Sequence, residues 1–571
     1  MLTNIKILNF KRLQNVEFEL GKSVLLIGPN NSGKSTALQA LALWNIGLRQ
    51  WVSKRSGSAE KKGVTINRRD LISIPIPMAK LLWNGLHVRN VERTKEGKPD
   101  TANIRIGIIV EGITNDVPWS CGLEFDYANE ESFYCRPLLS TDGSRSAIPK
   151  EALEVQIAFL PPMSGLAPSE FKLEAGGINV LLGEGQTAQV LRNLCFFIYE
   201  KTSSTNKDWA NVAEHIRKLF GITLLPPKYI TERGEITMSY KEHNITLDIS
   251  SSGRGLQQTL LLLAHLYANP KTVLLLDEPD AHLEYLRKQE IYRLLTELSE
   301  KQGSQVISAS HSTAVLNEAA DRDIVIAFVG KPHRIDDRGT QTTKALKSIG
   351  FEHYYLAEET GWVLYLEGST DLAMLKAFAD TLEHDAASLL ERPFVHWVEN
   401  KPENVFSHFF GVSDAKKDLV GIAIFDRMDK VFEPKPNLTM LSWSRRELEN
   451  YLCMEEVLLA YARYDLPDDL FGRPEAAKRE QAMRDAISEV GTSLKTLRNL
   501  EPWSPDTKAS DDFLDPLFRI YFAKLKLTNI LRKTDYHVLA HLVPKDKIDV
   551  EIIEKLDAIV AVAKMAHPVG E

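Results

Sequence analysis

An apolar run that leads directly into a glycine-rich turn and then a helical pattern constrains this chain most. Residues 23–41 read SVLLIGPNNSGKSTALQAL, with Gly28, Gly33, Lys34 and Ser35 at the spacing GxxxxGKS. The glycines let the backbone curl so that its N–H groups face phosphate oxygens, and the following helix N-terminus adds a positive dipole. The pattern therefore predicts a phosphate-binding P-loop at the end of a buried strand.

The side chains of this loop have distinct expected roles. Lys34 is expected to reach the β- and γ-phosphates of ATP, and Ser35 to bind Mg²⁺. Thr36 follows as a further donor. We assign nucleotide binding to Gly28, Asn31, Gly33, Lys34, Ser35 and Thr36.

A second apolar strand ends in two acids. KTVLLLDEPDAHLE (271–284) places Asp277 and Glu278 where one can hold a metal through water and the other can orient the attacking water. A third strand, SQVISASHS (304–312), ends in His311, which is placed to sense the γ-phosphate. Together with the P-loop, these residues predict a site that hydrolyses ATP.

A serine- and glycine-rich turn opens the apolar helix just before these acids. The segment LDISSSGRGLQQTLLLLAHL (247–266) resembles the signature motif of ABC-type ATPases. In that family the signature of one subunit completes the ATP site of another, so the resemblance implies a head-to-head homodimer. It assigns nucleotide binding to Ser251, Ser252, Gly253 and Gly255. Taken alone, the same turn fits a helix N-cap equally well.

The two halves of the ATP site are far apart in the sequence. About 240 residues separate Ser35 from Asp277, more than a minimal ATPase core needs. We therefore predict a mixed α+β insertion at about 45–190. Within it, Gln186 is a candidate Q-loop residue, although a simple helix-opening loop accounts better for the glycines around it.

Acidic residues follow two later apolar strands. WVLYLEGSTDLAMLKAFADTL (362–382) has Glu367 at the end of a strand and Asp371 in the turn that opens a helix. DLVGIAIFDRMDK (418–430) ends in Asp426 and Asp429. Because the carboxyl ends of parallel strands meet at one edge of a sheet, Glu367 and Asp426 are expected to converge. Mg²⁺ prefers such hard oxygen ligands and neutralises their repulsion, so the pattern predicts a metal site that can act on a phosphodiester.

This arrangement resembles the Toprim domain of topoisomerases, primases and nucleases of the OLD (overcoming lysogenization defect) family, where a strand-end glutamate and a later DxD supply the metal ligands. WSRRELENYLC (443–453) resembles an OLD-type segment that adds Glu449, with Glu447 and Arg446 beside it. RKTDYHVLAHLV resembles a C-terminal segment whose lysine, here Lys533, would stabilise phosphate charge in the transition state. The resemblance implies Mg²⁺, or Mn²⁺, held by Glu367, Asp371, Asp426, Asp429 and Glu449.

One feature departs from the family pattern. Asp426-Arg-Met-Asp429 has one residue more than DxD. Positions two apart share a face of a strand and positions three apart do not, so Asp429 reaches the metal only if the chain turns after Asp426. The alternative without a metal site is that Glu367 and Asp371 only cap a helix and that the later acids form a solvated helix face.

The order of these segments predicts an α/β protein with an ABC-type ATPase domain at 1–345, a parallel-sheet Toprim domain at 355–465 and a helical region at 466–571. It resembles the layout of the OLD family over nearly the whole chain. The resemblance implies an ATP-hydrolysing, metal-dependent endonuclease that acts on DNA, with RNA as an alternative, in anti-phage defence. A second reading is an ATPase sensor or scaffold whose degenerate Toprim domain controls a separate effector protein. A recombination ATPase of the RecF kind would not explain the second acidic cluster.

Charge and composition bound the partners. A net charge of −8 and a pI near 6 exclude a generally basic nucleic-acid binder and permit local basic surfaces. No apolar window reaches the length of a membrane helix, so we expect no membrane partner. The four cysteines are scattered and form no CxxC pair, which is typical of a reducing cytosol and disfavours a cysteine-based zinc site. We therefore expect a cytoplasmic protein.

Overall fold

A computed structural model of residues 1–571 describes most of the chain, which divides into two compact units, Met1–Thr343 and Lys344–Glu571. Each unit is described by itself. The residues outside the description are 56–62, 72–73, 75, 94–98, 140–143, 168, 202–206, 321, 336–349, 429–431, 465, 468, 470–471 and 569–571, together with the side chains of 91–93, 99–102 and 351.

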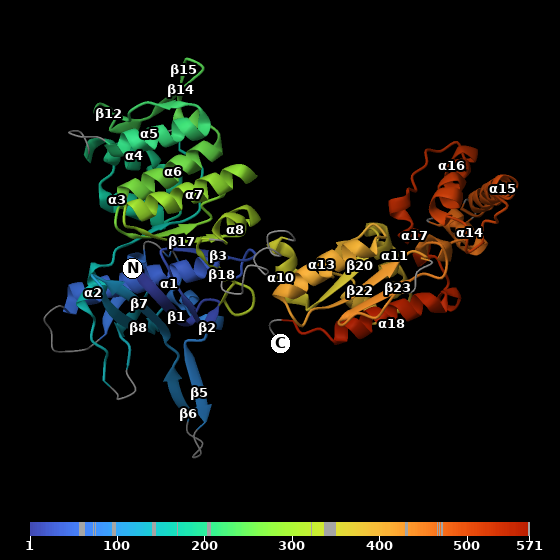
Figure 1. Ribbon diagram of the computed structural model, residues 1–571, viewed down its shortest axis with the longest axis horizontal. Helices are drawn as coiled ribbons and strands as arrows, with labels where there is room; N and C mark the ends of the chain where they lie inside the picture. Colours follow the sequence, from blue (N-terminus) through green and yellow to red (C-terminus); the bar gives the residue numbers. More distant parts are fainter. Residues whose placement is uncertain are drawn as a thin grey trace. The chain divides into compact units, whose positions relative to one another are not determined.

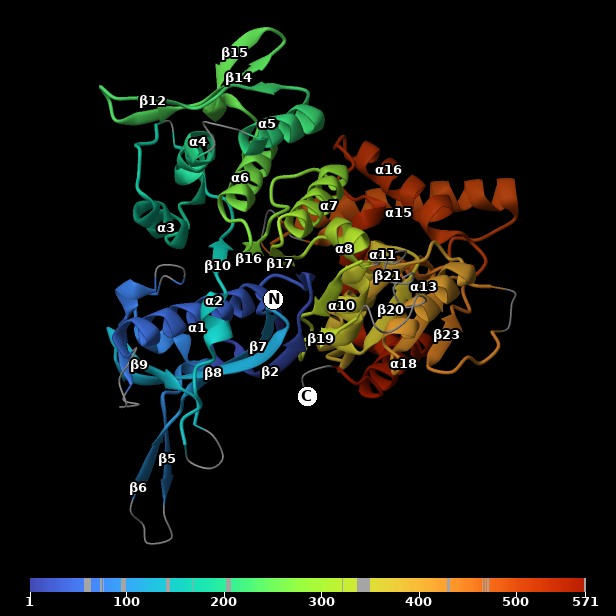
Figure 2. The same ribbon diagram turned by 60° about the vertical axis from the view of Figure 1, so that its left-hand side comes forward.

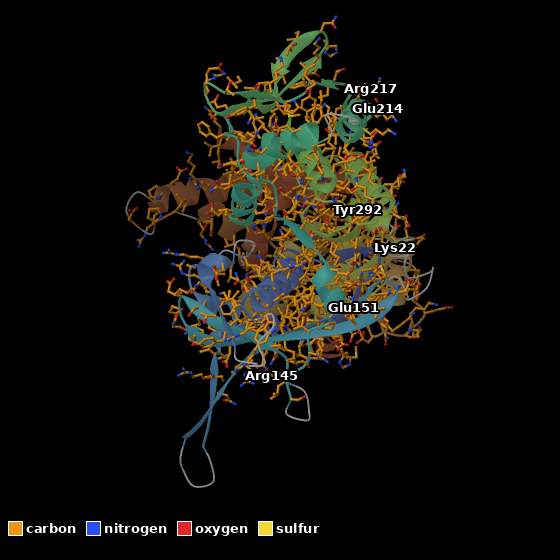
Figure 3. The ribbon with its side chains drawn as sticks, turned by 90° about the vertical axis from the view of Figure 1, so that its left-hand side faces the viewer. Lys22, Arg145, Glu151, Glu214, Arg217 and Tyr292 are labelled. Carbon is orange, nitrogen blue, oxygen red and sulfur yellow. The ribbon has the colours of Figure 1, made fainter. Side chains whose placement is uncertain are left out.

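The first sheet of the N-terminal unit is antiparallel and includes the first two strands of the chain. Its order is β2-β1-β7-β8-β9-β4, so strands from the segment that we expected to be an insertion pair directly with β1. On β8, the buried carboxylates of Glu124 and Asp126 pair with arginines, among them Arg145, which contacts Glu124 (Figure 3). The strands are β1 (Leu2–Phe10), β2 (Leu13–Glu19), β4 (Val64–Asn67), β7 (Ile106–Thr114), β8 (Val117–Asn129) and β9 (Ser132–Pro137).

The second sheet carries the nucleotide motifs. Its order is β10-β16-β17-β3-β18-β19, and all neighbours are parallel except the last pair. Every residue of its strands β16 and β17 is buried, and apart from Gln305 and Asp277 at strand ends they are apolar or small, as expected of a parallel sheet covered on both faces. The strands are β3 (Ser23–Ile27), β10 (Ile157–Leu160), β16 (Val273–Asp277), β17 (Gln305–Ser310), β18 (Ile324–Ala327) and β19 (His333–Arg334).

Helices cover both faces of this parallel sheet. Helix α1 (Lys34–Arg55) packs between the two sheets in one continuous core, and Figure 1 shows it between their strands. The opposite face is covered by a second core built around α6 (Arg254–Ala268) and α7 (Tyr285–Lys301). The result is a layered P-loop ATPase fold in which the carboxyl ends of β3, β16 and β17 share one edge.

Smaller elements surround these layers. The hairpin β5 (Arg89–Arg93) and β6 (Pro99–Asn103) projects away from the first sheet (Figures 1 and 2). On α5, Glu214 and Arg217 pair at the surface at 2.8 and 2.9 Å (Figure 3). The remaining elements are α2 (Lys150–Glu154), α3 (Ala175–Gly183), α4 (Leu191–Lys201), α5 (Lys207–Phe220), β11 (Thr223–Leu224), β12 (Lys228–Ile230), β13 (Glu235–Thr237), β14 (Ser239–Glu242), β15 (Ile245–Asp248) and α8 (Thr313–Ala319).

The second unit is built on a parallel sheet of order β21-β20-β22-β23. Alternate residues of β20 enter separate cores, with Val363 and Tyr365 on the side of α10 and α13, and Leu364 and Leu366 on the side of α11 and α18. These elements are α10 (Phe351–Thr360), β20 (Trp362–Leu366), α11 (Ser369–Leu382), β21 (Val395–Trp397), α13 (Pro402–Ala415), β22 (Val420–Phe425), β23 (Leu438–Ser442) and α18 (Val550–Lys564).

The C-terminal helices join the core on the α11 face. They contribute Val457, Phe518 and Ile559 to the same cluster as Leu364. The predicted fold class is confirmed: an α/β chain with a P-loop ATPase, a following parallel-sheet, Rossmann-like domain and a helical tail. The domain boundaries near 345 and 465 stay predictions. The further helices are α12 (Ala386–Leu389), α14 (Glu455–Arg463), α15 (Gly472–Arg498), α16 (Asp515–Lys524) and α17 (His537–His541). Within the described part of the chain, no helix is both long and apolar enough to span a bilayer.

Candidate active sites

The P-loop has the backbone conformation that its sequence requires. Gly33 has φ +106°, a conformation that favours glycine, and a Cβ there would lie 3.0 Å from Leu13 Cδ2 and require that side chain to shift. Asn31 is exposed and also has a positive φ of 66°. Lys34 is buried, and its ammonium donates to the carbonyls of Gly28 at 2.8 Å and Pro29 at 2.6 Å. Burial lowers the Lys34 pKa.

The loop side chains meet the acids at the end of β16. Ser35 Oγ donates to Asp277 Oδ1 at 3.0 Å, across 242 residues of sequence. Burial raises the Asp277 pKa to about 6, with Glu278 adding to the rise, while Ser35 and Lys34 oppose it. Glu278 Oε1 lies 3.6 Å from His311 Nδ1, and both side chains remain partly open to solvent. The structure thus brings Lys34, Ser35, Asp277, Glu278 and His311 together, with Thr36 half-buried in the first turn of α1.

Sequence reasoning missed a residue that organises this edge. Asp280 is buried, accepts a hydrogen bond from Ser310 Oγ at 2.7 Å and pairs with Lys288 at 3.2 Å. It therefore ties the loop after β16 to the end of β17, next to His311. The signal was available, since Asp280 is the third acid of the DEPD run. Gly255 lies against the same loop, where a Cβ would meet the His282 carbonyl oxygen at 3.3 Å.

The rest of the signature segment makes local contacts. Ser251 Oγ donates to the Asp248 carbonyl at 2.6 Å, and Ser252 Oγ donates to the Ile249 carbonyl at 2.7 Å. Gly253 is the exposed N-cap residue of α6, and a Cβ there would meet no atom within 4 Å. Neither hydroxyl accepts a helix N–H, so the serines do not cap α6, whose N-cap residue Gly253 has no side chain to do so. The predicted contact with a partner's nucleotide stays a prediction.

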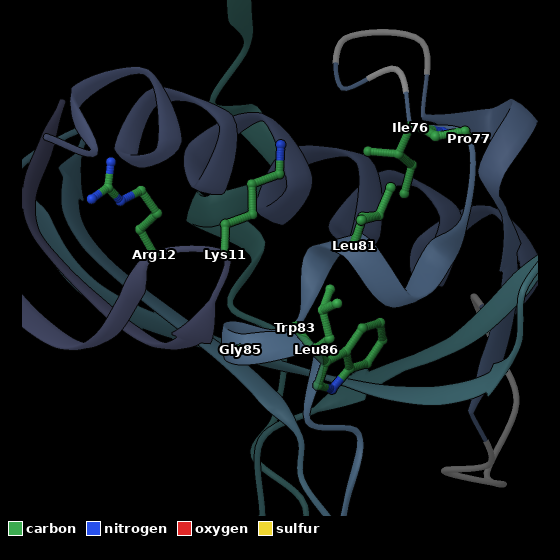
Figure 4. Close-up of a pocket in the computed structure, with 8 residues that line it drawn as sticks. All are labelled: Lys11, Arg12, Ile76, Pro77, Leu81, Trp83, Gly85 and Leu86. Atoms are coloured by element: carbon green, nitrogen blue, oxygen red, sulfur yellow. The ribbon is translucent and has the colours of Figure 1, made fainter. Parts of the chain in front are cut away.

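A pocket of about 510 Å³ lies beside the turn between β1 and β2 (Figure 4). Lys11 Nζ donates to Gln39 Oε1 of α1 at 2.6 Å, and burial lowers the Lys11 pKa to about 8. The pocket has two cationic side chains and no acidic one, so it lacks the ligands for a hard metal ion. Its lining is Lys11, Arg12, Ile76, Pro77, Leu81, Trp83, Gly85 and Leu86.

The second candidate site lies at the carboxyl edge of the parallel sheet in the C-terminal unit. Glu367 directly follows β20, and Asp426 directly follows its neighbour β22. Asp371 lies in the first turn of α11, where its Oδ2 accepts the Gly368 N–H at 3.2 Å, so it does cap the helix. Burial raises the Asp371 pKa to about 6, and the charge of Glu367 adds to the rise.

Asp426 is the most perturbed of these acids. Burial raises its pKa far above the ordinary range, and the hydrogen bond and charge of Glu367 raise it further, followed by the charges of Asp371 and Glu449. Its backbone N–H donates to Asn400 Oδ1 at 3.1 Å. Asn400 was not predicted, although it follows the short strand before α13. The convergence of Glu367 and Asp426 expected from parallel strands is therefore present in the structure.

Glu449 completes the group from a segment outside the sheet. It is 4% exposed on the short 3-10 helix Leu448–Tyr451. Burial raises its pKa to about 8, with Glu447 raising it and Lys533 lowering it. Lys533 Nζ donates to Ser510 Oγ at 3.0 Å and lies 4.0 Å from Asp511 Oδ1.

The segment that Lys533 contacts through Ser510 is a π-helix at Ala509–Leu514. The π-helix is a rare element that occurs frequently at functional sites. Its Ser510 N–H donates to the Glu447 carboxylate. Nearby, Arg427 pairs with Asp506 at 2.7 Å, which anchors the residue after Asp426. Neither Ser510 nor Asp506 was predicted. Asp429, the acid with the irregular spacing, lies outside the described residues.

The donor set of this acidic site fits a hard divalent cation. Four carboxyl groups from three segments interact here: Glu367 and Asp371 after β20, Asp426 after β22, and Glu449 on the 3-10 helix. Glu449 is buried, Asp371 and Asp426 are half-buried and Glu367 is exposed, and the pKa values of Asp371, Asp426 and Glu449 are raised. Among the described residues, Lys533 is the cationic side chain whose charge lowers the pKa of both Asp371 and Glu449 and so partly offsets the rise. Carboxylates that repel one another so strongly are stabilised by Mg²⁺ or Mn²⁺, which take oxygen ligands.

The fold and the first site define a P-loop ATPase joined to a parallel-sheet domain with an acidic edge. Two family models match the ATPase: "AAA ATPase domain" at residues 1–62 and "AAA domain, putative AbiEii toxin, Type IV TA system" at residues 221–317. The chain is also 22% identical over 327 residues to a curated protein named OLD nuclease from Thermus scotoductus, covering 55% of this chain and 59% of that protein. The predicted resemblance to OLD-family ATPases is confirmed. Both matched model ranges precede the acidic site, so the Toprim assignment stays a proposal.

Solved structures with a similar arrangement include heads of SMC proteins. A Thermotoga maritima SMC head domain has a TM-score of 0.31 and 15% identity, and covers 58% of this chain and 98% of that one. An SMC head bound to the C-winged helix domain of ScpA has a TM-score of 0.37, with the same identity and coverage. A third, an Smc head with an extended coiled coil bound to the C-terminal domain of ScpA derived from Pyrococcus furiosus, has a TM-score of 0.35 and 15% identity, and covers 61% of this chain and 99% of that one.

Proposed function

We propose that this protein is an ATP-hydrolysing, metal-dependent DNA endonuclease of the OLD type, with the acidic edge as its Toprim active site. The observation that carries the proposal is the convergence of Glu367, Asp371, Asp426 and Glu449 at one edge of the sheet, with the charge of Lys533 acting on Asp371 and Glu449. A solvated helix face would not bring acids from three segments into contact range or bury Glu449 to 4% exposure. The chain spans 59% of the length of the OLD nuclease that it matches, so the similarity supports the proposal without carrying it.

In the ATPase, the chain's own groups hold and orient the reactants. Lys34 exchanges its two carbonyl partners for phosphate oxygens, and the loop N–H groups bind the remaining charge. Ser35 and Asp277 would hold Mg²⁺, which supplies charge neutralisation when bound. Glu278 accepts a hydrogen bond from the attacking water and His311 faces it, so the pair responds to the γ-phosphate.

In the nuclease, the acids of the edge serve as ligands and Lys533 as a counter-charge. Glu367 and Asp426 are hydrogen-bonded, so a proton lies between them before a cation binds. Loss of that proton frees both carboxylates as ligands for Mg²⁺ or Mn²⁺, which would activate water and stabilise the leaving oxygen. Lys533 reaches the edge from the tail and neutralises charge on the phosphate in the transition state.

The assembly and biological role extend this proposal. The exposed N-terminus of α6 supports a homodimer in which Ser251, Ser252 and Gly253 complete a partner's ATP site. ATP binding and dimer closure then control access of DNA to the acidic edge. We propose that the protein acts in the cytoplasm in anti-phage defence. RNA is the alternative substrate, and the dimer is proposed to be able to assemble further into larger oligomers.

A second candidate is an ATPase sensor or scaffold that controls a separate effector. The extra residue between Asp426 and Asp429 favours it, because it alters the position of the second carboxylate. A Toprim site that has ligands for one metal ion and lacks them for a second would bind metal and still cleave nucleic acid poorly.

Plasmid nicking separates the two candidates. Wild type, Lys34→Ala, Glu278→Gln and Glu367→Ala are incubated with Mg²⁺ or Mn²⁺, with and without ATP, and ATP hydrolysis is measured in parallel. We expect Glu367→Ala to abolish cleavage and to leave ATP hydrolysis intact. Glu403→Ala, an exposed acid on α13, is the matched control and should retain both activities. If wild type hydrolyses ATP and never cuts DNA or RNA, the scaffold replaces the nuclease.

A further inference from the structure

Three histidines converge in the C-terminal unit on elements that the acidic edge does not use. His353 lies on α10, His396 on β21 and His408 on α13, and one ligand nitrogen of each lies within 4.8 Å of the others. His408 is buried, and the other two are half-buried. No motif in the sequence marks this group, because its members are spread over three elements.

The rings are arranged closely. His353 Nδ1 lies 2.5 Å from His408 Nε2. The ring of His396 stacks on that of His408, with centroids 3.8 Å apart and planes 13° apart. Tyr365 Oη, from β20, lies 2.8 Å from His408 Nδ1. Each ring is therefore positioned by its neighbours.

The hydrogen bond to Tyr365 gives His408 the arrangement of a metal ligand. A ligating histidine usually gives its other ring N–H to an oxygen, which fixes the tautomer and orients the ring. With Nδ1–H donated to Tyr365, the lone pair of His408 Nε2 points at His353 Nδ1, 2.5 Å away, a gap that a proton of His353 fills. Because Zn–N bonds are about 2.0–2.1 Å long, a cation replaces that proton only when the two rings move apart.

The chemistry of the three groups selects the class of cation. We propose that His353, His396 and His408 form a binding site for a borderline divalent transition-metal ion such as Zn²⁺, separate from the carboxylate site. Imidazole nitrogens suit zinc, cobalt, nickel and copper, whereas Mg²⁺ takes oxygen ligands. Three histidines leave the fourth tetrahedral position to water, and the half-buried rings of His353 and His396 leave a path to it.

The protonation state of the cluster supports this site. Burial lowers the pKa of His396 to about 4 and that of His408 to about 2, and the other histidines lower both further. Burial also lowers the pKa of His353, against the nearby Glu352. The rings are therefore neutral at pH 7, which is the form that binds metal without first losing a proton.

A bound ion would link three elements of one face of the sheet. Val363 and Tyr365 on β20, Ala357 on α10 and Phe409 on α13 form the apolar core beneath the histidines. Since α10 is the helix that leads into β20, an ion held by His353 would fix α10 against β21 and α13. The inference does not depend on the nuclease proposal, because it concerns other residues and another class of ion.

Zinc titration of the full chain tests the site. The protein carries Glu367→Ala to disable the acidic edge, is stripped with EDTA and dialysed, and is titrated with ZnSO₄ by calorimetry. We expect about one Zn²⁺ per chain, lost when His396→Ala is added and weakened about 10- to 100-fold by Tyr365→Phe. His541→Ala, an exposed histidine of α17, is the matched control and should bind as before. Circular dichroism verifies that each variant is folded.

X-ray absorption at the zinc edge makes the result independent of the variants. We expect imidazole scattering from about three histidines in the zinc-loaded Glu367→Ala protein. The proposal is overturned if this protein binds no zinc, if oxygen ligands dominate the spectrum, or if a folded His396→Ala protein binds the same amount. In that case the three rings are a hydrogen-bonded structural cluster.

Discussion

Replacing Glu449 with glutamine should stabilise the metal-free protein while removing a predicted metal ligand. Glu449 is 4% exposed, and burial raises its pKa from 4.5 to about 8. The ionised side chain is therefore costly in the folded state, with Glu447 adding repulsion. Glutamine keeps the shape of the side chain and removes the charge, so the repulsion disappears.

The magnitude follows from the linkage between proton binding and folding. Between pH 4.5 and about 8 the unfolded chain ionises Glu449 and the folded chain does not, so the wild type loses stability as the pH rises. Each pH unit in this window is worth about 1.4 kcal/mol, which makes the gain from Glu449→Gln about 3 kcal/mol at pH 7. For a unit of this size, this is about 6–12 °C in Tm.

Thermal unfolding in EDTA at pH 7 and at pH 4.5 measures the effect. The gain should be present at pH 7 and reduced to about 0.4 kcal/mol at pH 4.5, where the folded state holds the proton and the unfolded chain is half protonated. Glu455→Gln on α14, an exposed acid whose side chain is 52% exposed, is the matched control and should change stability by less than about 0.5 kcal/mol. An equal gain at both pH values, or a loss at pH 7, would refute the idea that these buried acids repel one another.

Three further predictions concern the ATPase unit. Glu278→Gln should reduce ATP turnover on the order of 10²-fold or more and keep ATP binding, because the general base is lost while the P-loop stays intact; unchanged turnover in a phosphate-release assay would exclude that role. His265 is buried, and its pKa is lowered to about 4. The free energy of unfolding should therefore fall by about 2 kcal/mol between pH 6.5 and pH 5, because the unfolded chain takes up a proton that the folded chain does not. His265→Leu should remove this pH dependence in urea unfolding. Gly47→Ala should lower the free energy of unfolding by about 1–3 kcal/mol, because the new Cβ would lie 2.9 Å from Phe125 Cε1. Gly176→Ala in α3 meets no atom within 4 Å and should stabilise the protein. Equal effects of the two substitutions on the urea midpoint would contradict the packing argument.

The P-loop and the acids at the end of β16 are local features, and the sequence alone predicted that each follows a buried strand. A strand, a turn and the start of a helix occupy fewer than twenty residues, and backbone sterics determine which conformation so short a stretch adopts. The convergence of Glu367 and Asp426 was also predictable, because consecutive parallel strands end at one edge. The roles of these side chains rest on the proposals above, and that of Asp429 stays a prediction.

Tertiary packing alone decided the rest. Glu449, Ser510 and Lys533 come from separate segments after the sheet, and only the burial of the C-terminal helices in the core around α11 brings them together. Asp280 and Asn400 had sequence signals, but their hydrogen bonds depend on how one loop meets its neighbour. His353, His396 and His408 had no signal at all.

The physical reason is the range of the forces involved. Local motifs are set by backbone sterics and by the alternation of buried and exposed positions, which a short window contains. The juxtaposition of distant side chains depends on how whole helices pack, since each position is the sum of many small apolar contacts. The sequence by itself therefore determined which polar side chains follow the buried strands of the two sheets, and the packing of α10, α13 and the C-terminal helices decided which other side chains surround them.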